Sequence, residues 1–182
     1  MRLPVNRSAI MAFPNAIGIP QARLCLERYT DPDGPTAAWL ACNPSVAGPV
    51  LDDPTTGRVV GHSARYGHLR SLIGNVWPYI SPYPADLWEA RRDGRLTRAM
   101  MNANQDALAM IGGQATLHVA AFGAVPGRKH PKAVAAALDT FTLSGAFPLY
   151  CLGTTDDNQP LHPLARGKYA ARNDAELREW KL

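Results

Sequence analysis

The sequence predicts an α/β domain of three layers, α/β/α, in which helices cover both faces of a central, mostly parallel sheet. Short apolar runs bounded by turn residues, such as residues 36–42, are typical of strands buried on both faces. Segments with helical spacing alternate with these runs three times, which favours parallel strands joined by crossover helices. We expect about four parallel strands and one antiparallel edge strand.

The first predicted element is a half-exposed strand. Residues 22–29 alternate in character, with Leu24 and Leu26 on one face and Arg23 on the other. A period of two residues is the pattern of a strand that is covered on one side. The segment DPDG at residues 31–34 then predicts a turn.

Two buried strands with a helix between them follow. Residues 36–42 are continuously apolar until Asn43-Pro44 stops them, so this strand should lie centrally in the sheet. Asp53 is placed to cap a helix over residues 54–66, because a proline suits the first helical position and glycine follows the end. Residues 70–76 predict the second buried strand.

The alternation continues through the rest of the chain. A loop rich in proline and aromatic residues comes first, at residues 77–88. The elements expected after it are a helix at 97–111, a strand at 115–122, a helix at 131–143, a strand at 148–152 and a last amphipathic helix at 173–180.

Length and composition predict one domain over residues 1–182. The chain is 46% apolar and 19% charged, which suffices for a single core. We expect the core within residues 22–166 and the first 18 residues to be loosely held. No apolar stretch approaches the ~18 residues that cross a membrane, so a cytoplasmic protein without a membrane partner is expected.

Charge and cysteine content bound the partners further. Fifteen arginines against four lysines give most of the net charge of +4, and arginine suits bidentate contacts to phosphate. Three cysteines without a C-x-x-C pair indicate neither a disulfide framework nor a metal cluster. The five histidines form no ligand set, so we expect no metal and no cofactor, and a nucleic acid or nucleotide as partner.

The candidate site follows from the strand ends. Ligands of open α/β sheets bind beyond the carboxyl ends of the strands. Three predicted ends carry a polar side chain that can hold a small planar ligand, namely Asn43, Asn75 and His162. Asp52 and Asp53 follow the first of them. Because Asp53 is placed as a helix cap, we prefer Asp52 for the chemistry.

This set of side chains suits hydrolysis of an N-glycosidic bond. The catalyst must hold the base, stabilise charge on the leaving ring and position a water. An amide can pair with a base edge, an imidazole can donate to the departing base, and a carboxylate can orient water. We therefore expect catalysis by Asn43, Asp52 and His162, and substrate binding by Ser45, Asp53, Asn75, Trp77 and Phe122.

Each of these residues also has a structural interpretation. Asn43 can form a turn, and Asn75 can cap loop backbone. Trp77 can stack on an extruded base or pack over the sheet edge. For phosphate we expect Arg58, Arg128 and Lys129, although Arg58 can equally be a solvated side chain of its helix. The GAVPG segment beside the last two lacks the ending of a phosphate-binding Walker loop.

Two segments resemble a known family. LACNPSVAGPVLDDPT and LYCLGTTDDNQPLHPL are similar to the two signatures of the bacterial and phage family called domain of unknown function 1643. The likeness covers residues 22–166. It implies nothing secure about activity.

A more remote likeness, to the uracil-DNA glycosylase superfamily, implies more. That superfamily has an Asp-Pro or Asn-Pro motif, a strand ending in Asn, a Trp-Gly or similar pair, and a final His-Pro motif. Their places are taken here by Asn43-Pro44, Asn75, Phe122-Gly123 and His162-Pro163. The resemblance implies a glycosylase-like fold, with Asn43 positioning water, Asn75 binding the base and His162 steadying it.

The departures from that superfamily concern its DNA-binding loop. The glycine that opens the first motif is missing, and Leu164 replaces the serine after His-Pro. Duplex DNA is therefore a doubtful substrate. We expect a base-recognising hydrolase that cleaves an N-glycosidic bond in DNA or a nucleotide, a modified base included. The alternatives are a non-catalytic nucleotide or nucleic-acid binding module and a hydrolase or transferase of another class.

Overall fold

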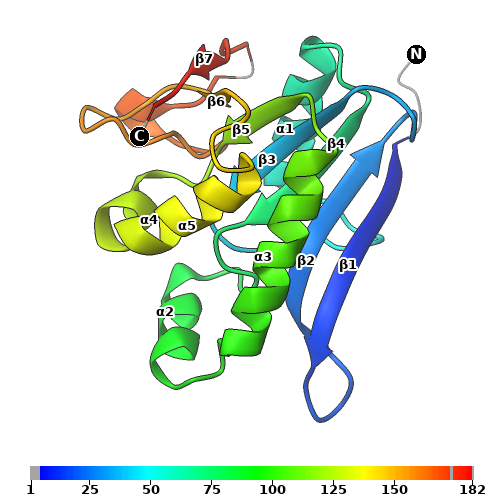
Figure 1. The fold of residues 1–182 in the computed structure, drawn as a ribbon, viewed down its shortest axis with the longest axis vertical. Coiled ribbons are helices and arrows are strands. Elements are labelled where there is room, and N and C mark those ends of the chain that lie inside the picture. The colour runs from blue at the N-terminus through cyan, green and yellow to red at the C-terminus, as the bar shows by residue number, and fades with distance from the viewer. Residues whose placement is uncertain (1–4, 173, 182) are drawn as a thin grey trace.

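A computed structural model describes residues 5–172 and 174–181. Its centre is one seven-stranded sheet with the order β1-β2-β4-β3-β5-β6-β7 (Figure 1). The strands are β1 (Asn6–Pro14), β2 (Pro20–Tyr29), β3 (Thr36–Ala41), β4 (Arg70–Asn75), β5 (Leu117–Ala120), β6 (Leu149–Cys151) and β7 (Arg178–Glu179).

The middle of the sheet is parallel and its edges are antiparallel. Strands β4, β3, β5 and β6 run in one direction, and β2 and β7 run against them. The edge strand β1 pairs antiparallel with β2 and therefore runs in the same direction as the four central strands. Every residue of β3 is buried, as the apolar run predicts for a central strand. The α/β class and the four parallel strands are confirmed, and antiparallel pairing occurs at both edges instead of one.

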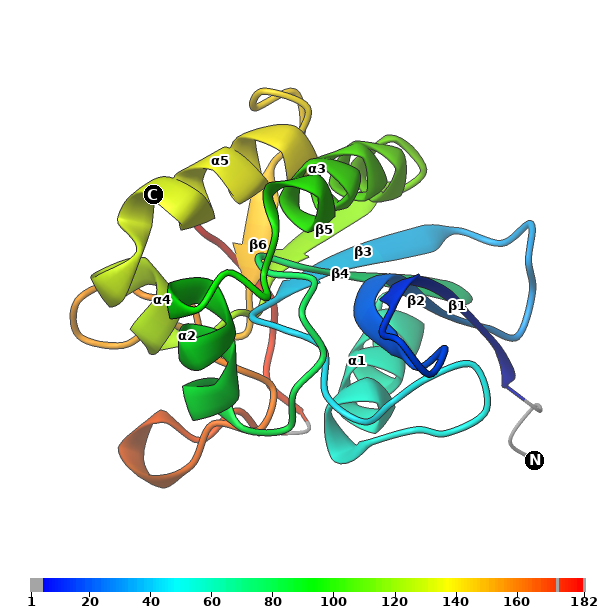
Figure 2. The same cartoon turned by 90° about the horizontal axis from the view of Figure 1, so that it is seen from below.

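Helices cover the two faces of the sheet. The helices are α1 (Pro54–Arg65), α2 (Pro84–Arg92), α3 (Arg98–Gly113), α4 (Ala124–Lys129) and α5 (Pro131–Phe141). Figure 2 shows α3 and α5 on one face and α1 on the other. The buried apolar residues form two clusters accordingly, one containing Leu108 and Phe141 and the other Trp39 and Val59.

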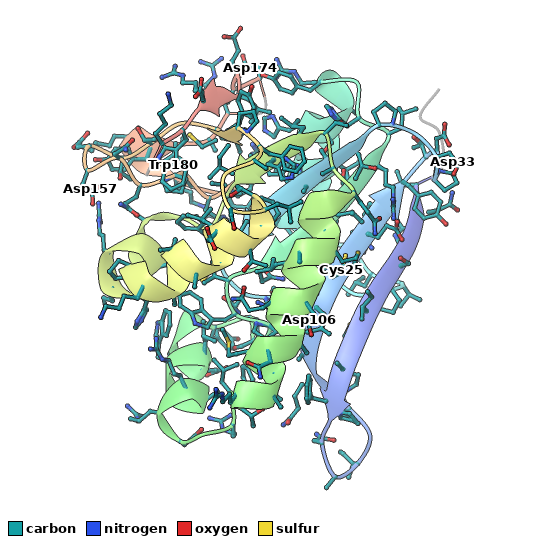
Figure 3. The ribbon with its side chains drawn as sticks, in the orientation of Figure 1. Cys25, Asp33, Asp106, Asp157, Asp174 and Trp180 are labelled. Atoms are coloured by element: carbon teal, nitrogen blue, oxygen red, sulfur yellow. The ribbon has the colours of Figure 1, made fainter. Side chains whose placement is uncertain are left out.

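Both ends of the chain differ from the prediction. Residues 6–14, expected to be loosely held, form β1 and pair along β2. The helix expected at 173–180 is wrong for the described residues 174–180, where a short strand pairs with β6. Trp180 decides this, because its buried ring packs edge-on against Phe122 and its backbone N–H donates to Leu149 (Figure 3).

Two helices in the middle of the chain were not predicted. Helix α2 lies within the segment expected to be a loop, and α4 occupies the expected glycine turn. Both segments contain prolines, which are tolerated in the first turn of a helix because the N–H groups there have no intrahelical partner.

A β-bulge changes the expected alternation of β2. Ile10 pairs with Cys25 and the next residue, Met11, pairs with Arg23, so Leu24 is an extra residue on β2. One extra residue shifts the alternation of side chains between the two faces. The expectation that Arg23 lies on an exposed face is therefore wrong, and its side chain is buried.

The contact between α3 and α5 depends on one glycine, and a substitution there tests the packing. A Cβ atom at Gly112 would lie 2.2 Å from the carbonyl oxygen of Phe141, whereas a Cβ at Gly113 would meet nothing within 4 Å. We expect Gly112→Ala to lower the free energy of unfolding by about 1–3 kcal/mol. The control Gly113→Ala should raise it by up to about 1 kcal/mol. Urea unfolding measures both, and equal losses in the two variants would contradict this packing.

Candidate functional site

A cavity of about 350 Å³ lies at the carboxyl ends of the parallel strands. It sits where the connections of β3 and β5 leave toward opposite faces of the sheet, which is the usual ligand position in this class of fold. The cavity is lined by Arg23, Ala41, Cys42, Asn43, Ser45, Asp53, Thr55, Thr56, Ile73, Asn75, Ser81, Pro82, Phe122 and His162. Asn43, Asn75 and His162, predicted from three separate strand ends, thus share one cavity.

Asn75 ends β4 and is fully buried. Neither atom of its side-chain amide has a hydrogen-bond partner among the described residues. Its backbone is held from the opposite layer, since Nδ2 of Asn104 in α3 donates to the carbonyl oxygens of Asn75 (2.9 Å) and Val76 (3.4 Å). Gly74 permits this close approach, because a Cβ there would lie 2.6 Å from Leu108.

His162 lies in the loop after β6, with its Cβ 3.4 Å from the position that a Cβ on Gly123 would take. The backbone N–H of Leu164 donates to Nδ1 of His162 at 3.1 Å. Burial lowers the pKa of His162, and the nearby charge of Asp53 opposes this in part. The ring is therefore neutral near pH 7, and because Nδ1 accepts, its proton is on Nε2.

Asp53 caps α1 and also lines the cavity. Its Oδ1 caps α1 by accepting from the backbone N–H of Thr56 at 2.8 Å and from the hydroxyl of Thr56 at 2.9 Å. Its Oδ2 makes no hydrogen bond within the described part of the chain. The carboxylate also lies close enough to Arg23 and His162 to raise the pKa of each.

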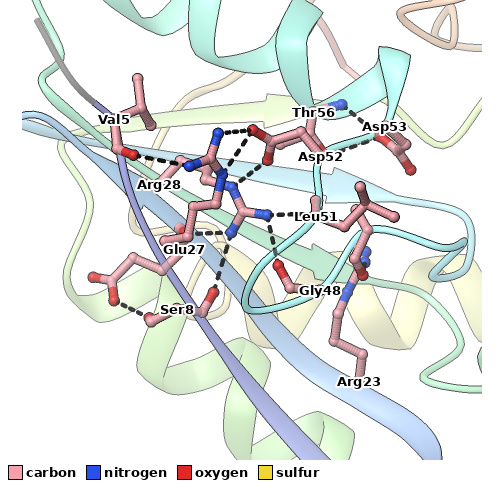
Figure 4. Close-up of polar contacts among 12 residues, drawn as sticks. Val5, Ser8, Arg23, Glu27, Arg28, Gly48, Leu51, Asp52, Asp53 and Thr56 are labelled. Carbon is pink, nitrogen blue, oxygen red and sulfur yellow. Dashed lines mark hydrogen bonds and ion pairs between the residues drawn. The ribbon is translucent and has the colours of Figure 1, made fainter.

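Asp52, the preferred carboxylate of the sequence analysis, lies outside the cavity lining. Its oxygens accept from Arg28 at 2.6 Å and from Arg7 at 3.0 Å. Burial acts to raise the pKa of Asp52, but the hydrogen bonds and charges of these two arginines outweigh it and lower the pKa. Figure 4 shows Asp52 turned toward Arg28, with Asp53 on the side where Arg23 lies. Of the two aspartates, Asp53 and not Asp52 therefore lines the cavity with Asn43, Asn75 and His162.

Arg28 explains why the two aspartates point apart. Its side chain is fully buried, and besides Asp52 it donates to four carbonyl oxygens. Two of these belong to Gly48 and Leu51, so the guanidinium ties the loop before α1 to β2 (Figure 4). With Asp52 held on Arg28, the next residue is free to cap α1 at the cavity.

Asn43 has a partly structural role. Its Nδ2 donates to the carbonyl oxygens of Pro44 (3.1 Å) and Ser81 (2.9 Å), which joins the loop after β3 to the loop after β4. Its Oδ1 accepts no hydrogen bond from the residues that the structure describes. The turn interpretation and the ligand interpretation of Asn43 are thus compatible, because each uses a different atom of the amide.

Residues 23–164 match the model of the family described as "Protein of unknown function (DUF1643)". The chain belongs to this family. Every residue that lines the cavity falls within the matched range. No curated protein and no solved structure matches, and the likeness to uracil-DNA glycosylases accordingly has no structural neighbour in support.

Several predicted site residues of this DUF1643 chain lie elsewhere. Trp77 is 2% exposed and packs edge-on against the rings of Trp88 and His130, as the core interpretation has it. The residues expected to bind phosphate are also absent from the cavity lining. Arg58 donates to the carbonyl oxygen of Ala171, Arg128 forms an ion pair with Asp157 on the outer loop (Figure 3), and Lys129 is exposed.

The cavity also contains a cation, Arg23, which is not among the site residues predicted from the sequence. Arg23 is 4% exposed, its Nη1 donates to the carbonyl oxygen of Ala47, and its Nε has no partner among the described residues. Burial lowers the pKa of Arg23 to about 10, against an opposing effect of Asp53, so the group stays charged at neutral pH. Arg23 lies near the beginning of β2 and not at the end of a strand, but because β2 is antiparallel its beginning lies at the same edge of the sheet as the ends of the parallel strands.

Two other classes of site find no support in the described ranges. Within residues 5–172 and 174–181, no group of three or more histidine, cysteine, aspartate or glutamate side chains could hold a metal ion. Among the helices in those ranges, none has the length and apolar character needed to cross a membrane.

Proposed function

We propose that this chain is a base-recognising hydrolase that cleaves an N-glycosidic bond. The observation that supports this most strongly is Asn75, a fully buried amide in the cavity wall whose two polar atoms have no partner among residues 5–172 and 174–181. Leaving such groups unpaired costs about 1–3 kcal/mol. A planar ligand edge that offers one donor and one acceptor side by side, as nucleobases do, satisfies both atoms at once.

The other side chains of the cavity suit the bond-breaking step. His162 can donate from Nε2 to an oxygen or nitrogen of the departing base, while Asp53 and Oδ1 of Asn43 orient a water. The carbon–nitrogen bond breaks with its electron pair going to the base, and the water oxygen bonds to the anomeric carbon. The proton lost by the water ends on the base. The negative charge of Asp53 favours the cationic sugar in the transition state.

Water is the nucleophile in this proposal. Cys42 also lines the cavity, but burial raises the pKa of its thiol to about 12. A thiol with this pKa is protonated at neutral pH and is a poor nucleophile. A covalent intermediate on Cys42 is therefore disfavoured.

Base release is the direct test. The full chain is incubated with nucleosides, nucleotides and single-stranded DNA, modified bases included, and free base is measured by chromatography. Release that depends on Asn75 and His162 is expected. Binding of a nucleotide without release would instead favour the binding module, and neither binding nor release would reject recognition of a base.

The pH dependence of base release should follow His162. Because burial lowers the pKa of His162 from 6.5, the neutral ring persists at pH 7, and the rate should be level there. It should fall in acid, as protonation of Nδ1 removes the hydrogen bond from Leu164. His162→Gln should lower the rate by about 10²–10⁴-fold and remove this acid limb. An unchanged acid limb in the variant would contradict the assignment.

A further inference from the structure

On the basis of the proposed function, we infer that the cavity contains a phosphate subsite formed by Arg23, Ser45 and Thr55 at the N-terminus of α1. The inferred substrate is a mononucleotide with a terminal phosphate, in which the base meets Asn75 and the phosphate meets Arg23. A strand of nucleic acid is not the substrate on this inference.

The buried guanidinium of Arg23 is the observation that favours an anionic ligand. Its guanidinium is buried and forms no ion pair with the residues described by the structure, although one carbonyl oxygen, of Ala47, accepts from Nη1. Buried cations are normally paired, because removing a charge from water is costly. Nε, which has no partner in the described ranges, can donate with Nη2 to two oxygens of one phosphate.

Two hydroxyls and a helix end complete the subsite. Ser45 and Thr55 line the same cavity, and neither side chain makes a hydrogen bond within the described part of the chain. Helix α1 has 12 residues, and its N-terminus attracts anions through its free N–H groups and its dipole. Asp53 occupies the N–H of Thr56, which leaves the N–H of Thr55 available to a ligand.

The strand order separates the two ends of the ligand. Arg23 lies on β2 and Asn75 on its neighbour β4, whereas His162 follows β6 on the far side of β3 and β5. Asp53 is close enough to both Arg23 and His162 to affect their pKa values. A ligand with its base between Asn75 and His162 and its phosphate at Arg23 thus brings its sugar near Asp53.

Depth and size favour a terminal phosphate. A phosphate inside a nucleic-acid strand has chain on both sides, which must continue into solvent, so it meets a protein at a rim. Arg23 is 4% exposed, and the cavity of about 350 Å³ is near the lower end of the ~300–1,000 Å³ typical of small-molecule sites. A mononucleotide can place its phosphate at this depth.

Calorimetry on the full chain tests the subsite separately from catalysis. The probes are the common nucleosides, their 5′-monophosphates, inorganic phosphate and a short single-stranded oligonucleotide. We expect one 5′-monophosphate to bind at least about tenfold tighter than its nucleoside, the equivalent of one charge-assisted pair. Inorganic phosphate should compete with it, and raised salt should weaken it. Equal affinities for nucleoside and monophosphate, or tighter binding of the oligonucleotide, would overturn the inference.

Arg23→Gln should abolish the preference for the monophosphate and change the affinity for the nucleoside by less than about threefold. The combined variant Ser45→Ala and Thr55→Val should reduce the preference with the Arg23 contacts intact, which keeps the test valid if Arg23→Gln does not fold. Arg58→Gln is the matched control, since Arg58 lies outside the cavity, and should keep the full preference. A preference that survives in both cavity variants contradicts the subsite.

The subsite and the proposed function can fail independently. Phosphate binding that depends on Arg23, with no base released from any probe, keeps the subsite and rejects hydrolysis. If the chain releases base from both nucleosides and monophosphates and binds the two with equal affinity, hydrolysis is retained and the subsite is rejected.

Discussion

Replacing Asn75 by leucine is expected to stabilise the folded chain and to abolish binding of the base. Both polar atoms of the buried amide lack a hydrogen-bond partner in the part of the chain that the structure describes, and removing such a pair relieves a cost of about 1–3 kcal/mol. Leucine adds apolar contacts at the cavity wall but offers no hydrogen bond. Thermal unfolding should show a higher midpoint for Asn75→Leu, and calorimetry should show a loss of nucleotide affinity of at least about 10²-fold.

Asn104→Leu is the matched control for this prediction. Asn104 is also a fully buried asparagine, but its Nδ2 holds the carbonyl oxygens of Asn75 and Val76. Its loss should lower the free energy of unfolding by about 1–3 kcal/mol, opposite in sign to the effect at Asn75. If Asn75→Leu is destabilised to the same extent as Asn104→Leu, Asn75 has a structural role that the structure does not account for.

The adjacent aspartates should separate stability from activity. Asp53→Asn should lower base release by at least about 10²-fold and leave stability nearly unchanged, because asparagine caps a helix as well as aspartate does. Asp52→Asn should keep base release. It should cost about 1–3 kcal/mol of stability, since it removes the charge that faces buried Arg28, a loss moderated by the 33% exposure of the Asp52 side chain.

Both variants are measured under the same conditions, by base release at saturating substrate and by urea unfolding. The reverse result, with activity lost in Asp52→Asn and retained in Asp53→Asn, would reject the proposed role of Asp53 in base release. Loss of activity in both variants without a change in stability would show that the loop before α1 acts as a unit.

Much of the fold could be predicted from local pattern. The buried strands, the helices α1, α3 and α5 and the cap at Asp53 follow from apolar runs, helical spacing and turn residues, which act over a few neighbouring positions. The terminal strands β1 and β7 could not be predicted in this way, because each forms only by pairing with another strand. For β7 that strand is β6, which is distant in sequence. For β1 it is the neighbouring β2, but a bulge shifts the pairing. Trp180 is buried because its ring packs against Phe122, a contact that the sequence pattern around residue 180 does not indicate.

By itself, the sequence determined which parallel strands end in polar side chains, and hence that Asn43, Asn75 and His162 face one edge of the sheet. Only the tertiary structure decided which charged side chains line the cavity with these three residues. Arg23 enters the cavity because β2 runs antiparallel and contains a bulge. Asp53 and not Asp52 lines the cavity, because Asp52 forms an ion pair with buried Arg28. Strand pairing and the burial of a single guanidinium depend on residues that are distant in sequence, so the spacing of neighbouring residues does not predict them.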